Sequence, residues 1–456
     1  MPISEKDFVQ QFSKQVLDGR TALFLGAGGS ADAGYPTWRA LFKPMADELG
    51  LDQDEMLDNY TLAQFYSNRY GALELRRRIE AALSREPQES QLINRLVNIG
   101  FESIWTTNFD NAIETAFKKK NVLVNTVISD RDLGTVDTAK RINIFKMNGS
   151  ISNLSEIIAT QNDYEMYSRS HELMMLFFKR ELISSTFLFI GYSFTDGLVL
   201  ECLSSIAHCL GDSFGMHYSI MRRVENSPYF EYFIRDLEER YHLRVLLVDG
   251  YDDIPRVLDR LSAAVKSKKV FISGALGYEA SGDQKRLSLS FLKSIVAALY
   301  GRGYRITNGI GRYFGTHLIG YASEHLARAG IKNPERYLSV TAFTGIGEHR
   351  EEQKAEGRIK AIDGCGACLF VFGSHIDGDN MGGVWEEYKI ARDLGKVIVP
   401  IRCDGMTSQS IWEDVRAHLT QFPYLEKSLD VLDIGRDSEQ LARTIISILD
   451  DAGCFA

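Results

Sequence analysis

Cysteine and proline are scarce in this chain, and no charge of one sign dominates it. Six cysteines among 456 residues are too few for a disulfide framework, so we expect a cytoplasmic, reducing location. Nine prolines leave no long stiff linker. The 52 basic and 61 acidic residues give a net charge of −9, which offers no support for non-specific nucleic-acid binding because that needs a positive surface.

Long apolar runs are missing as well. No run approaches the ~20 residues that span a bilayer, and the opening MPISEKDFVQQF lacks the basic and apolar segments of a signal peptide. We therefore expect no membrane association. The single CxxC, Cys365 and Cys368, has no second pair to complete a tetrahedral zinc site. Small residues opening a buried strand are the favoured interpretation, and no metal is expected.

Two segments share one pattern, an apolar strand that runs into glycines. TALFLGAGGS (21–30) and KVFISGALGYEAS (269–281) both match the opening of a doubly wound α/β domain. We predict two Rossmann-like domains with parallel sheets, 1–265 and 268–456. The first should carry a helical cap from 40–100 and 163–182. Apolar runs predict strands at 21–25, 103–107, 122–128, 142–147, 186–191, 217–222 and 243–248, then at 269–273, 304–307, 337–341, 367–372 and 397–401.

The first glycine cluster lies in FLGAGGSADAGYPTW (24–38). Glycines between a strand and a helix let the backbone approach a phosphate, which the helix N-terminus also attracts. Ser30 could add a hydroxyl. Tight turns also use glycine, so the cluster alone is a weak signal.

Three later motifs follow in order: WTTNFDNAIE (105–114), INIFKMNGSI (142–151) and FLFIGYSFTDGLV (187–199). Taken alone, Asn108 and Asp110 would indicate only a capped turn before a helix. With the glycine cluster, the four motifs resemble those of the SIR2-like superfamily, in which NAD is bound and its nicotinamide–ribose bond is broken. The resemblance implies that Asn108 reaches the nicotinamide ribose, that Asp110 holds the loop or the nicotinamide amide, and that Ser193 binds a ribose or phosphate edge. Asp196 could cap the next helix. The implied NAD-binding residues are Gly26, Ala27, Gly28, Ser30, Asp32, Tyr35, Trp38, Asn108, Asp110, Gly149, Ser150 and Ser193.

One position departs from the family pattern. Asn148 stands where the family has the histidine of its H-G-S motif, so the implied catalytic positions are Asn108 and Asn148. Asparagine can hydrogen-bond but cannot take up a proton near neutral pH. We favour a catalytically impaired His→Asn form. A natural chain that uses other groups, or one that only binds NAD, stays open. The two CxxC pairs of deacylase zinc modules are missing, which favours an NAD hydrolase over an NAD-dependent protein deacylase.

The second half contains VFISGALG (270–277), RITNGIGRYFGT (305–316), GIGEHREEQKAEGRIKAI (345–362) and NMGGVWEEYKIARDLGK (380–396). This order resembles the SLOG domain, a relative of the LOG phosphoribohydrolases. Their P-G-G-x-G-T loop is broken here, so we expect a nucleotide sensor and not a second hydrolase. Arginine forks suit phosphate, although a solvated helix of mixed charge is the alternative for Arg350 and Arg358. Glu386 could accept from ribose hydroxyls or be an exposed first-turn carboxylate. The implied activator-binding residues are Gly274, Ala275, Asn308, Gly309, Arg350, Arg358, Gly382, Gly383 and Glu386.

A SIR2-like domain followed by a SLOG domain resembles the NAD-hydrolysing effectors of bacterial Thoeris anti-phage defence. The resemblance implies a partner enzyme with a TIR domain that makes a cyclic ADP-ribose isomer. That isomer would bind the SLOG domain and release the NAD hydrolase. It also implies a homo-oligomer, either a tetramer or a filament.

Overall fold

The computed structural model describes residues 2–52, 58–137, 141–343, 349–374 and 382–452. The chain divides into two compact units, residues 1–262 and 263–456. The division falls within helix α12 (Asp253–Ser267), which is followed directly by strand β8 (Lys269–Ala275). The chain therefore passes from one unit to the other within a helix.

The first unit is built on a seven-stranded sheet in the order β3-β4-β2-β1-β5-β6-β7, and every neighbouring pair is parallel. All five residues of the central strand are buried, because helices cover both faces of a parallel sheet. The predicted strands are confirmed to within two residues at each end. The strands are β1 (Thr21–Leu25), β2 (Ser103–Thr106), β3 (Val124–Val127), β4 (Ile142–Lys146), β5 (Thr186–Ile190), β6 (His217–Arg222) and β7 (Leu243–Val248).

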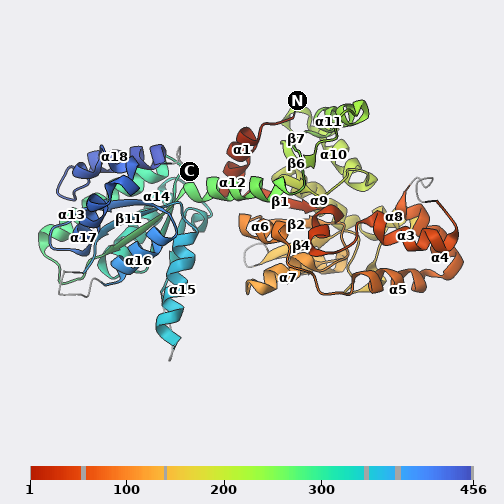
Figure 1. Ribbon diagram of the computed structural model, residues 1–456, viewed down its shortest axis with the longest axis horizontal. Coiled ribbons are helices and arrows are strands. Elements are labelled where there is room, and N and C mark those ends of the chain that lie inside the picture. Colours follow the sequence, from red (N-terminus) through yellow and green to blue (C-terminus); the bar gives the residue numbers. More distant parts are fainter. Residues whose placement is uncertain (1, 53–57, 138–140, 344–348, 375–381, 453–456) are drawn as a thin grey trace. The chain divides into compact units, whose positions relative to one another are not determined.

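Helices cover this sheet and also form a cap from the predicted segment 40–100 (Figure 1), whereas most of the predicted segment 163–182 is α9, which packs on the sheet. Aromatic residues of β1, β2 and β5 pack in one apolar cluster with side chains of α9, α10 and α11. A separate apolar cluster contains side chains from α3, α4, α5, α6 and α7. Of these helices, α3, α4 and α5 form most of the cap, and α8 packs on α4. The helices are α1 (Glu5–Leu17), α2 (Ala27–Ser30), α3 (Trp38–Leu49), α4 (Asn59–Tyr70), α5 (Ala72–Leu83), α6 (Gln91–Ile99), α7 (Ala112–Lys119), α8 (Gln161–Ser170), α9 (Glu172–Ser184), α10 (Gly197–Leu210) and α11 (Pro228–Tyr241).

The strand order reverses at β1, where ligands of doubly wound folds bind. From β1 the chain moves to β2 on one side, and after β4 it crosses to β5 on the other. The carboxyl ends of β1, β2, β4 and β5 therefore share one edge of the sheet. The four sequence motifs all lie in the loops that leave this edge.

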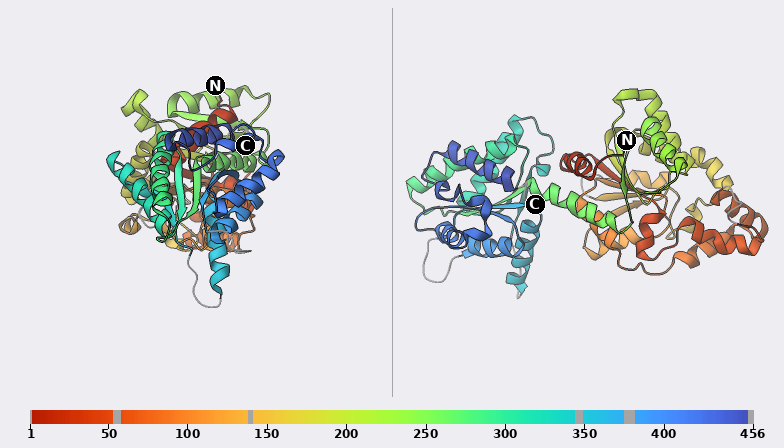
Figure 2. Two further views of the ribbon diagram at one scale, coloured as in Figure 1. Left: turned by 90° about the vertical axis from the view of Figure 1, so that its left-hand side faces the viewer. Right: turned by 45° about the horizontal axis from the view of Figure 1, so that its top comes forward.

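The second unit holds a five-stranded parallel sheet in the order β10-β9-β8-β11-β12. Its remaining strands are β9 (Arg305–Gly309), β10 (Leu338–Thr341), β11 (Ala367–Phe372) and β12 (Val397–Ile401), again as predicted. α13 contacts α14 and α18, while α16 contacts α15 and α17. Figures 1 and 2 show α15 extending beyond the rest of its own unit. The helices are α13 (Gly282–Gly301), α14 (Tyr313–Arg328), α15 (Arg350–Asp363), α16 (Gly382–Asp393), α17 (Thr407–Ala417) and α18 (Ser438–Ala452).

Cys365, just before β11, and Cys368, within it, are buried free thiols. This agrees with the interpretation of the CxxC as small residues that open a buried strand. Within the described residues, no helix combines the length and apolarity that crossing a bilayer requires.

Candidate functional site

The glycine loop after β1 packs directly on the loop after β5. Gly26 N–H donates to the Ile190 carbonyl (2.9 Å), and Gly28 N–H donates to the Gly191 carbonyl (3.0 Å). A Cβ on Gly26 would lie 2.4 Å from the Gly191 oxygen, and one on Gly191 would lie 2.1 Å from the nitrogen of Gly29. These glycines therefore have a packing role that sequence reasoning did not separate from phosphate binding.

Asn108 connects the loop after β2 to this glycine loop. Its Nδ2 donates to the Gly26 carbonyl (3.1 Å) and to Ser30 Oγ (2.9 Å), while its backbone N–H donates to Thr106 Oγ1 (2.9 Å). The side chain is buried, and its Oδ1 accepts no hydrogen bond from the described residues. The amide is thus fixed in orientation, with one acceptor left for a ligand.

A buried lysine also fixes the loop after β2, which contains Asn108. Lys146, at the end of β4, is fully buried and donates from Nζ to the carbonyls of Phe109 (3.2 Å) and Asp110. It also pairs with Glu114 Oε1 at 3.0 Å. Burial raises the pKa of the Asp110 carboxyl, and a hydrogen bond from the Ala112 N–H and the charge of Lys146 oppose that shift in part. The Asp110–Ala112 bond (3.0 Å) also matches the capped-turn interpretation of this motif.

Asn148 follows β4 and is buried beside the cap. Its Nδ2 donates to the Tyr60 hydroxyl (3.1 Å), and its Oδ1 accepts no hydrogen bond from the described residues. Gly149 takes φ +85°, and a Cβ there would lie 2.2 Å from the Glu156 carbonyl oxygen, so glycine is required. Ser150 is fully buried and donates to Asn111 Oδ1 (3.4 Å), which ties it to the Asn108 loop.

The cap contributes aromatic residues to this site, of which Trp38 was predicted and Tyr60 and Tyr164 were not. Trp38 lies 5.2 Å, centroid to centroid, from both Phe109 and Tyr60. Tyr60 and Tyr164 donate to opposite oxygens of Asp196, each at 3.2 Å. Asp196 also caps α10 as predicted, because its Oδ1 accepts from the Leu198 N–H (3.0 Å). No local sequence signal marks these tyrosines, since their place depends on how the cap packs.

Two predicted NAD contacts have their polar groups engaged elsewhere. The Asp32 carboxylate accepts from Ser90 Oγ (2.8 Å) and the Leu92 N–H (3.2 Å) at the start of α6. The Tyr35 hydroxyl donates to the Arg85 carbonyl (2.9 Å). Ser193 is exposed at the sheet edge, where its hydroxyl pairs with Thr195 Oγ1 (2.8 Å). The structure thus gives Asp32 and Tyr35 structural partners and leaves Ser193 accessible.

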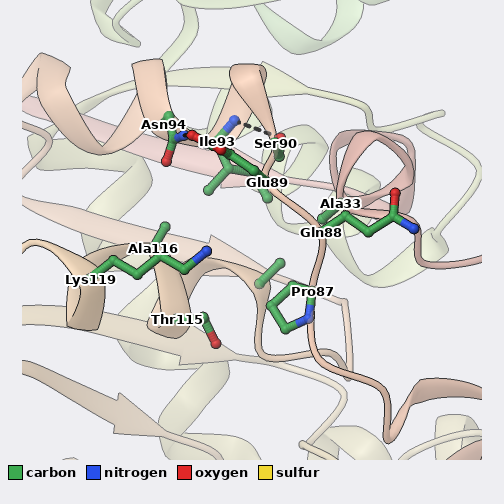
Figure 3. Close-up of a pocket in the computed structure, with 11 residues that line it drawn as sticks. Ala33, Pro87, Gln88, Glu89, Ser90, Ile93, Asn94, Thr115, Ala116 and Lys119 are labelled. Carbon is green, nitrogen blue, oxygen red and sulfur yellow. Dashed lines mark hydrogen bonds between the residues drawn. The ribbon is translucent and has the colours of Figure 1, made fainter.

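A small pocket lies behind the glycine loop, between its 3₁₀ turn and helices α6 and α7 (Figure 3). Its lining includes Ala33, Ser90 and Thr115, and at the start of α6 the Ile93 N–H donates to Ser90 Oγ (3.0 Å). Its volume of about 20 Å³ fits roughly one water molecule. This pocket is therefore too small for a nucleotide.

The second unit has a pocket of about 380 Å³ at the carboxyl ends of β8 and β9, a volume within the small-ligand range. Most predicted activator residues line it, whereas Gly382 and Glu386 are not part of the lining. Gly382 lies at the start of α16, with φ +69°. The lining also includes Ser273, Phe343, Lys354, Ser374 and Glu387, which were not predicted. The predicted lining residues are Gly274, Ala275, Asn308, Gly309, Arg350, Arg358 and Gly383.

Arg358 lies between two carboxylates at this pocket. Its Nη1 donates to Glu386 Oε2, and its Nε lies 3.6 Å from Glu387 Oε1, too far for a hydrogen bond. Ser273 Oγ donates to Glu387 Oε2 (2.5 Å). Burial raises the pKa of Glu387 to about 7, despite the opposing effects of Ser273 and Arg358. An anionic ligand that engages Arg358 would compete with Glu386.

Two known families match different parts of the chain. Residues 102–246 match the SIR2-like domain, and residues 253–452 match the Sir2- and TIR-associating SLOG family. The first match begins after the glycine loop but includes Asn108, Asn148 and Ser193. The chain therefore belongs to the proteins that join a SIR2-like domain to a C-terminal SLOG domain.

Similar proteins extend over nearly the whole chain. The NAD(+) hydrolase ThsA of Cytobacillus dafuensis is 27% identical, over 98% of this chain and 97% of its own length. ThsA of Bacillus cereus (strain MSX-D12) is 27% identical, over 97% of each. Over nearly its whole length, the chain is therefore similar to proteins named NAD(+) hydrolase ThsA. A solved trehalose-6-phosphate synthase, OtsA, aligns at 15% identity over 91% of this chain and 83% of its own, with a TM-score of 0.22. That similarity is too weak to support any argument.

Proposed function

We propose that the first unit binds NAD at the sheet edge and hydrolyses it to nicotinamide and ADP-ribose. The supporting observation is a pair of buried amide oxygens, Asn108 Oδ1 and Asn148 Oδ1, which have no partner among the described residues. They follow the neighbouring strands β2 and β4. A buried acceptor without a donor is destabilising, and ribose hydroxyls are donors of suitable size.

The chemistry of NAD cleavage fits this arrangement. The nicotinamide–ribose bond breaks through a state with positive charge on the ribose, so fixed dipoles and oriented hydroxyls lower the barrier. Asn108 would hold the ribose, and Asp110 would hold its loop or the nicotinamide amide. The names of the similar proteins, NAD(+) hydrolase ThsA, support cleavage, and a match to the Defense-associated sirtuin 2 of Bacillus subtilis supports a role in defence. We propose the other predicted NAD contacts on the same grounds: Gly26, Ala27, Gly28, Ser30, Asp32, Tyr35, Trp38, Gly149, Ser150 and Ser193.

Asn148 is expected to limit the rate. A positioned proton acceptor contributes roughly 10²–10⁴-fold to catalysis, and an amide cannot act as one. We therefore propose an impaired His→Asn form that binds NAD well and cleaves it slowly.

The second unit would regulate this activity. The Arg358 pocket suits a phosphate-bearing ligand, which we propose is a cyclic ADP-ribose isomer made by a TIR-domain enzyme. The family that matches this unit is called Sir2- and TIR-associating, which supports that source. Activation requires that the isomer bind the active state more tightly than the resting state. A cytoplasmic homo-oligomer, either a tetramer or a filament, completes the proposal.

An NAD-cleavage assay tests this function. The full chain and Asn148→His are each incubated with NAD, with and without cyclic ADP-ribose and its linkage isomers, and nicotinamide release is measured. We expect Asn148→His to be at least 100-fold faster when activated, from the contribution of a proton acceptor. Equal activated rates for the two forms would refute the impairment.

Product analysis separates the alternatives. Addition of an acylated peptide would yield acyl-ADP-ribose if the protein were an NAD-dependent deacylase, whereas a hydrolase yields ADP-ribose alone. If calorimetry detects NAD binding while neither form releases nicotinamide, the protein is a non-catalytic NAD-binding or assembly protein.

A further inference from the structure

A chain of hydrogen bonds leads from Asn148 to a carboxylate under the cap. Asn148 Nδ2 donates to the Tyr60 hydroxyl (3.1 Å), and that hydroxyl donates to Asp196 Oδ2 (3.2 Å). Tyr60 belongs to α4, and Asp196 immediately precedes α10. The position expected to hold a base is thus connected through one phenol to a group that can take up a proton.

The two oxygens of Asp196 have different partners. Oδ1 accepts from the Leu198 N–H (3.0 Å) and from the Tyr164 hydroxyl (3.2 Å), whereas Oδ2 accepts from Tyr60. A tyrosine oxygen carries one donor and can accept as well. The Tyr60 oxygen can therefore accept from a substrate hydroxyl or water while its own proton points at Oδ2.

We propose that Tyr60 and Asp196 together accept the proton released in NAD hydrolysis, in place of a histidine at position 148. The proposal rests on the NAD hydrolysis proposed above. It attributes the slow turnover that the Asn148 form retains to proton transfer through Tyr60 and Asp196. Tyr60 would contact the reacting water or hydroxyl, and Asp196 would act through Tyr60. Asn148 Nδ2 holds the Tyr60 oxygen in place.

The step balances without any further reactant. The water oxygen bonds to ribose C1′ while the C1′–N bond breaks. The electron pair of the broken bond goes to nicotinamide, which leaves as a neutral molecule. The water proton passes to the Tyr60 oxygen as the Tyr60 proton passes to Asp196 Oδ2. Asp196 then releases the proton to solvent. The sum is NAD⁺ and water giving nicotinamide, ADP-ribose and one proton.

The surroundings of Asp196 favour this role. Burial raises the pKa of its carboxyl, which makes the carboxylate a better proton acceptor than an exposed one. The titratable groups that face it come from α4, α8, α10 and the loop after β5. Burial also raises the pKa of each, so they are uncharged at neutral pH: Tyr60, Tyr164, Tyr167, Tyr192 and Cys202.

Two matched variants test the pair in the full chain. Tyr60→Phe and Tyr164→Phe each remove one hydroxyl donor to Asp196, and of these two hydroxyls it is that of Tyr60 that accepts a hydrogen bond from Asn148. With activator present, we expect Tyr60→Phe and Asp196→Asn to lower kcat about 100-fold with little change in KM, the range for a proton-transfer group. Tyr164→Phe should stay within about threefold of the parent. Asparagine caps helices about as well as aspartate, so Asp196→Asn should still fold.

The pH profile adds a readout that a structural role would not change. The parent kcat should fall as the pH falls through the raised pKa of Asp196, and this acid limb should be missing from the residual rate of Asp196→Asn. Equal losses in the two Tyr→Phe variants, or an unchanged acid limb in Asp196→Asn, would overturn the inference. A parent that releases no nicotinamide while Asn148→His does would also overturn it, yet leave the proposed function standing. If neither form binds or cleaves NAD, both fail.

Discussion

Asn108 donates from its amide nitrogen to the Ser30 hydroxyl across 2.9 Å, and this bond joins the loops that leave β1 and β2. With the bond to the Gly26 carbonyl, both amide protons of Asn108 are engaged within the protein. The amide oxygen is the part left for a ligand. Two motifs that lie about 80 residues apart in the sequence are thus connected by hydrogen bonds into one site.

Gly191→Ala should destabilise the first unit. The residue has φ +65°, and an added Cβ would lie 2.1 Å from the backbone nitrogen of Gly29, which cannot move without displacing the glycine loop. We expect a loss of about 2–4 kcal/mol, from strain and overpacking together. Chemical denaturation measures it. Gly215→Ala is the control, because nothing lies within 4 Å of its Cβ position. Equal stability of the two variants would contradict the packing account.

Lys146→Met should lower the stability of the first unit and weaken NAD binding near the Asn108 loop. It removes a fully buried charge and leaves two carbonyls and Glu114 without their donor. Breaking a buried pair in this way costs about 3–5 kcal/mol, and the Asn108 loop should lose its fixed position. Denaturation and NAD calorimetry report the two effects. Lys120→Met, which removes an exposed bond to Asn98, should have little effect on either. A Lys146→Met protein as stable as this control would disprove the role of the lysine.

Arg358→Ala should weaken activator binding. A charged hydrogen bond to phosphate contributes about 1.5–3 kcal/mol, so the Kd for cyclic ADP-ribose isomers should rise roughly 10- to 100-fold. Calorimetry on the full chain measures this. Arg328 is the control, because it forms an exposed pair with Glu324 and does not line the pocket. If the arginine of α15 is only part of a solvated helix, both variants will bind alike.

Glu387 should make the stability of the second unit depend on pH. Its pKa rises from 4.5 to about 7 in the fold, so the fold favours the protonated carboxyl. That stabilisation is complete below pH 4.5 and is lost as the pH rises through about 7, by an amount on the order of 2–3 kcal/mol. Hydrogen exchange of β8 and β11 between pH 5 and 8, corrected for the intrinsic rate, should show the loss. Glu387→Gln should flatten the profile, and Glu386→Gln, at an exposed position, should not. A parent profile that is already flat would rule out this titration.

Much of this fold could be predicted because its strands are short apolar runs bounded by glycine and polar residues. The strands at 21–25 and 367–372 are buried along their whole length, and such runs are typical of parallel sheets. The motifs also converge as predicted, because the carboxyl ends of parallel strands share one edge.

The rest depends on contacts between distant residues. Tyr60 and Tyr164 meet Asp196 through the packing of the cap, and their sequence neighbourhoods contain no nucleotide signal. Glu387 follows Glu386 in sequence, yet one is buried against Ser273 and the other is exposed. The packing of α16 against β8 decides which of these two glutamates lines the pocket. The periodicity of the sequence did not predict that choice. Asp32 and Tyr35 matched a motif, yet their hydrogen bonds to residues 85–92 depend on a long-range contact that the motif does not predict.

The central claim is that the edge of the sheet that carries Asn108 and Asn148 is the NAD site. Titration calorimetry of NAD into the full chain tests it most directly, because binding does not require the missing histidine. We predict one NAD bound per chain, with the Kd raised at least tenfold by Asn108→Ala and unchanged by Asn98→Ala, which removes an amide from the exposed face of α6. A chain that binds no NAD, or one whose affinity survives Asn108→Ala, would contradict the account.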